Sequence, residues 1–343
     1  MRLPAFLLLL TVWASAATPK RPSHLHNRHS SNLVWQTRAT TFTGVDTTKT
    51  GALIHWDMGD GSSQNINDPV KVYPDTALKT VRMISSDGWT GLTVLKVHNK
   101  SMRGRIPSIA EAVNLTDFRA YGNDLTGPLP ALDTNTALVY FNVSGNSLTG
   151  LIPSLASNIA LTTFAVNGNH LNSTIPSLVT NTALAVFNIG NNFYITGPIP
   201  SLAANAALTE FNCEYNRVDG SIPSLAANTA LETLNVQVNW LDGSIPSLTT
   251  NTALKYLAVG YNSLTGYVGG LGTRALLIFN IYGYNALTET AINAILADLV
   301  VAQAGGNPVC DVILSGGGNE APAGQGIKDA ATLVAAGWTV ATN

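Results

Sequence analysis

A unit of 23 residues recurs through most of this chain and limits its possible folds more than any other feature. One copy runs from Leu138 to Ala160 and reads LVYFNVSGNSLTGLIPSLASNIA. The other copies follow at steps of 22 to 24 residues and begin at Leu92, Leu115, Leu161, Leu184, Leu208, Leu231, Leu254 and Leu276. A repeat of this length is typical of a solenoid, in which each unit packs only against its neighbours and the stack presents long regular surfaces.

The first residues of each copy alternate apolar and polar side chains, which predicts one short β-strand per copy. Strands of successive copies should pair in parallel at about 4.8 Å, so nine of them should span about 40 Å. An Asn follows most of these strands, at positions 123, 146, 169, 192, 216, 239 and 262. Its side-chain amide can satisfy backbone groups of the next turn. The segment SLxxNxA is too short for a long helix, which predicts turns or single 3₁₀ turns.

The consensus L-x-x-[FL]-x-[VI]-x-x-N-x-L-x-G-x-I-P-S-L-x-x-N-x-A resembles the leucine-rich-repeat superfamily, in the subclass with L-x-G-x-I-P after the strand. The resemblance covers residues 92–287 as eight full copies and a partial ninth. It implies an α/β solenoid with a parallel β-sheet on the concave face and mostly turns and 3₁₀ segments on the convex side. A small β cap and an α/β cap should close its N- and C-terminal ends. The first copy departs from the pattern, because Lys100 stands where the Asn should be.

Residues 1–16 are typical of a secretory signal peptide, with Arg2, an apolar run from Phe6 to Val12, and the small residues Ala14-Ser15-Ala16. We therefore expect a secreted protein, extracellular or at the cell surface. No later apolar run reaches the ~18 residues of a membrane span. Residues 17–50 are expected to be a flexible linker. Their three histidines have no acidic or cysteine partner nearby, so neither a metal nor another cofactor is expected.

Both flanks of the repeats are predicted to fold as caps. Residues 51–91 alternate in short runs, and WDMGDGSS with Tyr73 resembles part of a PKD-type β-sandwich, which implies a truncated PKD-like β cap. Residues 288–343 are predicted to form a helix, a strand (CDVIL), a second helix and a last strand. This end resembles a GWTV-type cap of repeats in secreted bacterial and viral proteins. Its task would be to cover the open final turn.

Composition and motifs exclude several classes of function. Charged residues are only 11% of the chain and the formal net charge is −2, which argues against a nucleic-acid partner. There is no G-x-S-x-G, H-E-x-x-H or C-x-x-C motif. Glu210 and Glu214 are about 13 Å apart along an extended chain, too far for a glycosidase pair. We predict no enzyme. Cys213 occupies a buried apolar position, so a disulfide with Cys310 is not expected.

Outward-facing strand residues form columns that are rich in amides and hydroxyls and have Tyr at both ends. Such a surface suits a protein or polysaccharide ligand. The candidate ligand-binding residues are Arg119, Tyr121, Tyr140, Asn142, Asn188, Glu210, Asn212, Glu214, Asn235, Trp240, Tyr256, Asn280 and Tyr282. The alternative is that stacked Asn and Thr side chains form ladders that only keep the sheet soluble. Candidate N-glycosylation sequons begin at Asn99, Asn114, Asn142 and Asn172.

Three hypotheses of function follow from these patterns. The first is a secreted, non-enzymatic binding or adhesion module that engages a protein or polysaccharide through the concave face. The second is a self-associating structural subunit of an extracellular filament or surface layer, favoured by low charge and many small residues. The third and weaker one is ice binding by regular Thr and Asn arrays, although Val, Glu, Tyr and Gly interrupt the columns.

Overall fold

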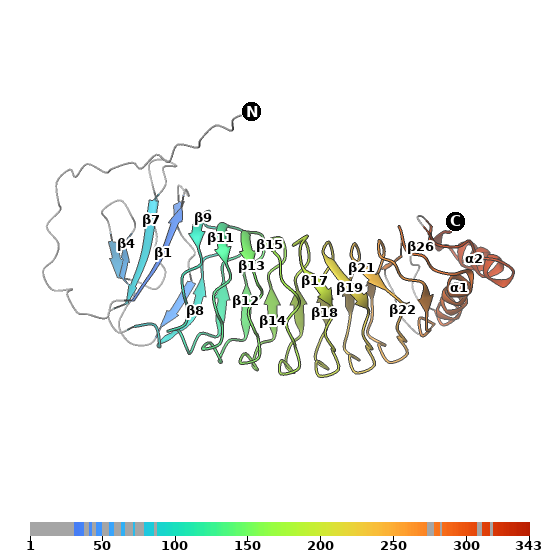
Figure 1. The fold of residues 1–343 in the computed structure, drawn as a ribbon, viewed down its shortest axis with the longest axis horizontal. Coiled ribbons are helices and arrows are strands. Elements are labelled where there is room, and N and C mark those ends of the chain that lie inside the picture. Colours follow the sequence, from blue (N-terminus) through green and yellow to red (C-terminus); the bar gives the residue numbers. More distant parts are fainter. Residues whose placement is uncertain are drawn as a thin grey trace, which may run out of the picture.

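The computed structural model describes residues 31–37, 41–42, 46–49, 55–57, 63–65, 71–72, 79–85, 88–272, 278–281, 283–306, 311–315 and 318–343. They form an elongated row of turns with a β cap at one end and two helices at the other (Figure 1). The expected signal peptide, the three histidines, Cys310 and Tyr282 lie outside the described residues.

Nine strands open the nine repeats, as predicted, and neighbours pair in parallel with equivalent residues opposite each other. The cap strands β3, β26 and β27 extend this sheet to twelve strands. The nine are β8 (Leu92–Lys96), β10 (Asp117–Arg119), β12 (Tyr140–Asn142), β14 (Thr163–Ala165), β16 (Val186–Asn188), β18 (Glu210–Asn212), β20 (Thr233–Asn235), β23 (Tyr256–Ala258) and β25 (Ile278–Asn280). The predicted solenoid with one parallel sheet of repeat strands is therefore confirmed.

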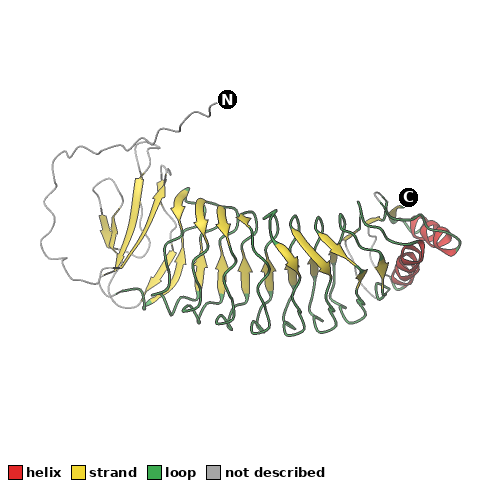
Figure 2. Ribbon diagram, in the orientation of Figure 1, coloured by secondary structure: helices red, strands yellow, loops and turns green. Residues whose placement is uncertain are grey.

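A second row of short strands was not predicted. Each lies on the segment after the Asn, or after Lys100 in the first copy, where the backbone extends beside a neighbouring turn (Figure 2). The row contains β9 (Met102–Arg105), β11 (Asp124–Pro128), β13 (Ser147–Gly150) and β15 (His170–Leu171), then a separate sheet of β17 (Thr196–Pro198), β19 (Arg217–Ser221) and β21 (Trp240–Asp242), then β22 (Ser244–Ile245) with β24 (Gly266–Tyr267). Of the two predicted alternatives for the S-L-x-x-N-x-A segments, turns and single 3₁₀ turns, the described residues have turns, such as the one closed by Asn135 N–H on the Leu132 carbonyl at 3.0 Å.

The N-terminal cap extends both rows of strands. β1 (Ser31–Thr37) pairs antiparallel with β9 and with β7 (Lys79–Ser85), and β3 (Asp46–Lys49) pairs antiparallel with β8. The flexible linker expected over residues 17–50 is therefore wrong for β1 and β3. The physical reason is that the first solenoid turn would otherwise leave the edges of β8 and β9 unpaired. The cap also contains β2 (Thr41–Phe42), β4 (His55–Asp57), β5 (Ser63–Asn65) and β6 (Lys71–Val72).

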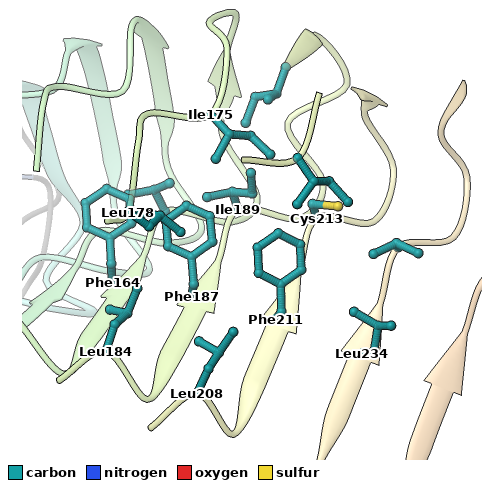
Figure 3. Close-up of a cluster of buried hydrophobic side chains, with 14 of the residues drawn as sticks. Phe164, Ile175, Leu178, Leu184, Phe187, Ile189, Leu208, Phe211, Cys213 and Leu234 are labelled. Carbon is teal, nitrogen blue, oxygen red and sulfur yellow. The ribbon is translucent and has the colours of Figure 1, made fainter. Parts of the chain in front are cut away.

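A column of phenylalanine rings fills the interior of the repeats. Successive ring centroids from Phe118 through Phe141, Phe164 and Phe187 to Phe211 lie 5.4 to 5.7 Å apart, with nearly parallel planes. Figure 3 shows three of these rings side by side, followed by Leu234 at the equivalent position. Cys213 is fully buried in the same core and burial raises the pKa of its thiol, so its predicted role as a small apolar residue is confirmed.

Two ladders of buried Asn side chains tie the turns together. In the predicted one, Asn146 donates through Nδ2 to the carbonyls of Ala120 and Val143 at 3.0 Å, and its Oδ1 accepts from Leu125 N–H at 3.0 Å. The second ladder was missed, although the Asn of S-L-x-x-N recurs with the same period. Each member donates to two carbonyls of the preceding turn. The members are Asn135, Asn158, Asn181, Asn205, Asn228 and Asn251.

The C-terminal cap matches the predicted order of elements: α1 (Glu289–Ala304), β26 (Asp311–Ile313), α2 (Gln325–Ala335) and β27 (Thr339–Ala341). Thr288 is the N-cap of α1, and its side-chain hydroxyl accepts a hydrogen bond from Ala291 N–H. β26 pairs with β25 and β27 pairs with β26, both in parallel, so the cap continues the main sheet beyond the repeats. Among the described residues, no helix is long and apolar enough to cross a membrane.

Candidate functional site

The N-terminal part of the concave face is a cluster of charged and aromatic side chains. Arg119 donates through Nε and Nη2 to the two carboxylate oxygens of Asp117, at 2.8 and 3.0 Å, and its guanidinium carbon lies 4.0 Å from the Tyr140 ring centroid. The hydrogen bond to Asp117 raises the pKa of Arg119. Lys96 Nζ lies 3.6 Å from the same carboxylate. Three neighbouring strands therefore supply one ordered basic and aromatic group.

His98 and Tyr121 extend this cluster at the ends of their strands. Their ring centroids are 4.4 Å apart and their planes differ by 15°, so the rings are stacked. Burial lowers the pKa of His98, and the positive charges of Lys100, Arg119 and Lys96 lower it further. The imidazole is therefore favoured in its neutral form. Sequence reasoning missed His98, because it belongs to the first copy, where the Asn pattern is absent.

Asn142, Asn188 and Asn212 occupy equivalent positions on their strands, and the backbone holds the side chain of each. The Oδ1 atoms of Asn142, Asn188 and Asn212 accept from backbone N–H groups two residues on, at 3.0, 3.2 and 2.9 Å. The Nδ2 groups of two of them point to neighbouring side chains: Asn188 donates to Glu210 at 3.0 Å, and Asn142 donates to the Tyr140 hydroxyl at 3.4 Å. Half of each of these three amides is thus committed to the backbone of its own turn.

Glu214 organises the middle of the concave face. Its Oε1 accepts from Asn191 at 3.1 Å, and its Oε2 accepts from Asn235 and Gln237 at 2.8 Å each. Asn280 extends the network by donating to Gln237 Oε1 at 3.4 Å. The residues come from four different turns, so the structure brings together several candidates that are far apart in sequence. Gly190 leaves the room for this group, since an added Cβ would lie 3.0 Å from Glu214 Cγ.

Two carboxylates lie in the middle of the concave face, Glu210 on β18 and Glu214 just after it. Neither Glu210 nor Glu214 forms an ion pair within the described part of the chain, and both are half-buried. Tyr256 lies at their C-terminal side, and its pKa is raised by burial and then by the negative charge of Glu214. The concave face is therefore acidic in the middle and basic at its N-terminal end. The described residues hold no cluster of three His, Cys, Asp or Glu side chains that would suit a metal ion.

Two predicted groups lie elsewhere. Trp240, a candidate expected to be exposed beside the ladder Asn, follows Asn239 and lies on β21 of the second row of strands, where it is 58% exposed. The sequons also occupy different environments. Asn99, Asn114 and Asn172 are exposed, whereas Asn142 is half-buried on the concave face, where it also accepts from the Ser144 hydroxyl at 2.7 Å.

The repeats match known proteins in sequence and structure. Residues 137–159 match the Leucine Rich Repeat family. The chain is similar to the Arabidopsis receptor kinase HAESA, solved with the peptide hormone IDA and the co-receptor SERK1, at 25% identity and a TM-score of 0.58; the match covers 67% of this chain and 42% of HAESA. The fold is a leucine-rich-repeat solenoid. The search of curated proteins found no significant match.

Other leucine-rich-repeat structures are similar as well. The ectodomain of GASSHO1/SCHENGEN3 from Arabidopsis thaliana, in complex with CASPARIAN STRIP INTEGRITY FACTOR 2, is 25% identical with a TM-score of 0.55, over 67% of this chain and 30% of that one. InlJ from Listeria monocytogenes is 21% identical with a TM-score of 0.50, over 68% and 51%, which shows the fold alone. The chain therefore spans less than half the length of the two plant receptors.

Proposed function

We propose that this protein is an extracellular, non-enzymatic binding module whose concave face engages a protein or peptide ligand. Two similar leucine-rich-repeat proteins, HAESA and GASSHO1, were solved with ligands of this kind, which supports the proposal. The residues that recur in each repeat stabilise the fold, because they form the phenylalanine column and the two Asn ladders. Function is therefore expected among the residues that vary between copies.

One observation carries the proposal: Glu210 and Glu214 are half-buried carboxylates without a cationic partner among the described residues. The amides that donate to Glu210 and Glu214 recover part of the free energy that burial of these charges costs, but no cation among the described residues recovers the rest. A basic side chain of a ligand would recover it by forming a charge-assisted hydrogen bond. The half-buried rings of Tyr140 and Tyr256 lie on either side of this centre and can contact the apolar parts of the same ligand.

The test is a binding screen against displayed extracellular proteins and peptides and against an array of glycans. The concave variants are Tyr140→Ala, Tyr256→Ala and Glu210→Gln, and Val179→Ala on the exposed convex side is the matched control. We expect a ligand with a basic group whose affinity falls roughly tenfold or more in the concave variants, and not in the control. Equal binding by all variants would refute the assignment of the concave face. Binding of glycans alone would refute the assignment of the ligand class.

A further inference from the structure

The one 24-residue step in the repeat creates a distinct surface on the second row of strands. In most copies three residues separate the ladder Asn from the following Gly, as in Asn146 to Gly150. Four residues separate Asn192 from Gly197, so one residue is inserted there. The insertion coincides with a break in the second row, because β15 and β17 are joined only by the isolated bridge between Thr174 and Thr196.

The inserted segment exposes two aromatic side chains. Phe193 adopts a left-handed backbone conformation with φ of +66°, which non-glycine residues rarely adopt, and both Phe193 and Tyr194 are exposed. A conformation of this kind costs about 1 kcal/mol or more. Ser147 and His170, which follow the ladder Asn in copies without the insertion, do not have a positive φ, so the conformation of Phe193 accompanies the inserted residue. The insertion thus exposes both aromatic side chains at this place.

Tyr194 forms one side of an aromatic and charged platform on the sheet β17–β19–β21. The Arg217 guanidinium carbon lies 4.8 Å from the Tyr194 ring centroid and 5.7 Å from the Trp240 ring centroid. Asp219 is the Cα partner of Trp240 across the two strands, and Asp242 follows on β21. Arg217, Asp219 and Asp242 are exposed, and within the described residues none of the three forms an ion pair.

The chemistry of this platform fits a sugar chain better than a protein. Pyranose rings present an apolar face that stacks on aromatic rings, and hydroxyls that pair with carboxylates and guanidinium groups. A protein partner would have to desolvate three charges at the centre of the contact, where interfaces are depleted of charge. Sugar hydroxyls can replace the water of each charge instead. Two carboxylates beside one guanidinium also disfavour a polyanionic chain.

We propose that Tyr194, Arg217, Asp219, Trp240 and Asp242 form a binding site for a neutral polysaccharide, separate from the concave face. Trp240 and Tyr194 stack on the sugar rings, Arg217 donates to hydroxyls, and the two carboxylates accept from them. The site extends the proposed function, because a module that engages a protein through one face would be anchored to a glycan matrix through another.

The test is titration of the full chain with neutral hexasaccharides of glucose, xylose and N-acetylglucosamine and with polygalacturonate as the anionic probe, followed by tryptophan fluorescence and calorimetry. We expect one neutral probe to bind. We also expect Trp240→Ala and Arg217→Gln to weaken its binding roughly tenfold or more. His170→Ala, at the position equivalent to Trp240 three turns earlier, should bind as wild type does.

Tyr140→Ala and Tyr256→Ala should leave glycan binding unchanged, which separates this site from the concave one. All substituted side chains of the platform are exposed, so circular dichroism should show wild-type folding. Failure of every neutral probe to bind, binding of polygalacturonate alone, or binding that survives Trp240→Ala would each overturn the proposal without bearing on the concave face.

Discussion

At the scale of single residues, buried amides distinguish the residues that hold the fold from those that are free for function. Asn181 shows why: its Nδ2 donates to the carbonyls of Leu155 and Asn158, both at 2.9 Å and both in the preceding turn, and so joins two successive turns. Its Oδ1 has no partner among the described residues, so the donor side alone explains why Asn is needed. A side chain without two N–H donors would remove one of the two hydrogen bonds that each of these buried carbonyls accepts, because the backbone N–H groups of Asn158 and Leu161 donate to them as well.

Asn181→Asp should therefore be strongly destabilising. The carboxylate has no donor for the two carbonyls, and it is a buried charge without a counterion. We expect a loss of about 3 kcal/mol or more in the free energy of unfolding, measured by urea titration. Thr182→Ala on the adjacent exposed position is the control and should change stability by less than about 0.5 kcal/mol. A small effect of Asn181→Asp would mean that the second ladder is dispensable.

The lowered pKa of His98 predicts that the stability of the fold depends on pH. Its pKa is lowered in the folded state, so between the folded value and the unfolded value of about 6.5 the unfolded chain binds more protons. The contribution of neutral His98 is present above the unfolded pKa and is lost as pH falls through the folded pKa.

His98→Phe keeps a ring against Tyr121 and removes the titration. Wild type should lose stability relative to this variant when the pH is lowered from about 7.5 to about 5, as measured by thermal unfolding. Parallel pH profiles of the two proteins would show that His98 does not titrate differently on folding.

At the scale of elements, the 23-residue period predicted the nine strands of the main sheet and the first Asn ladder, and helical spacing beyond the repeats predicted both C-terminal helices. The period did not predict the second row of strands, because T-G-x-I-P segments carry no alternation and pair only through backbone groups. It also missed β1 and the polar segment β3, which become strands because the first repeat offers unpaired edges. Of the candidate site, the strand residues could be predicted from alternation. The contacts of Glu214 and the platform around Arg217 depend on neighbouring turns.

The stacked phenylalanine rings predict how substitutions of Phe187 on β16 change stability. Phe187 lies between Phe164 and Phe211, whereas β20 and β23 have Leu234 and Leu257 at the same position. Phe187→Leu should thus cost about 1–1.5 kcal/mol. Phe187→Ala leaves a cavity and should cost about 3–5 kcal/mol. Chemical denaturation measures both, and equal costs would show that the ring column is not a close-packed unit.

At the scale of the whole molecule, each turn packs against the turns beside it and the caps close both ends. Removal of one complete turn should then leave a folded protein. Deletion of residues 138–160 joins Ala137 to Leu161. This junction is equivalent to the present one between Ala160 and Leu161, and it brings Phe118 beside Phe164. We expect a cooperatively unfolding protein with a lower melting temperature.

Deletion of residues 138–148 is the matched control, because it removes half a turn and puts both Asn ladders out of register. This variant should not fold, as judged by circular dichroism and size-exclusion chromatography. If the full-turn deletion fails to fold as well, the repeats are not independent units.

The central claim is that the variable residues of the concave face contact the ligand while the repeated residues only fold. Hydroxyl-radical footprinting of the complex with the ligand found in the binding screen tests it most directly, because it measures the solvent access of each side chain. Tyr121, Tyr140 and Tyr256 should become protected, while the exposed convex residues Ile159 and Val179 should keep their reactivity. Protection of the convex residues, with unchanged reactivity of the three tyrosines, would contradict the account.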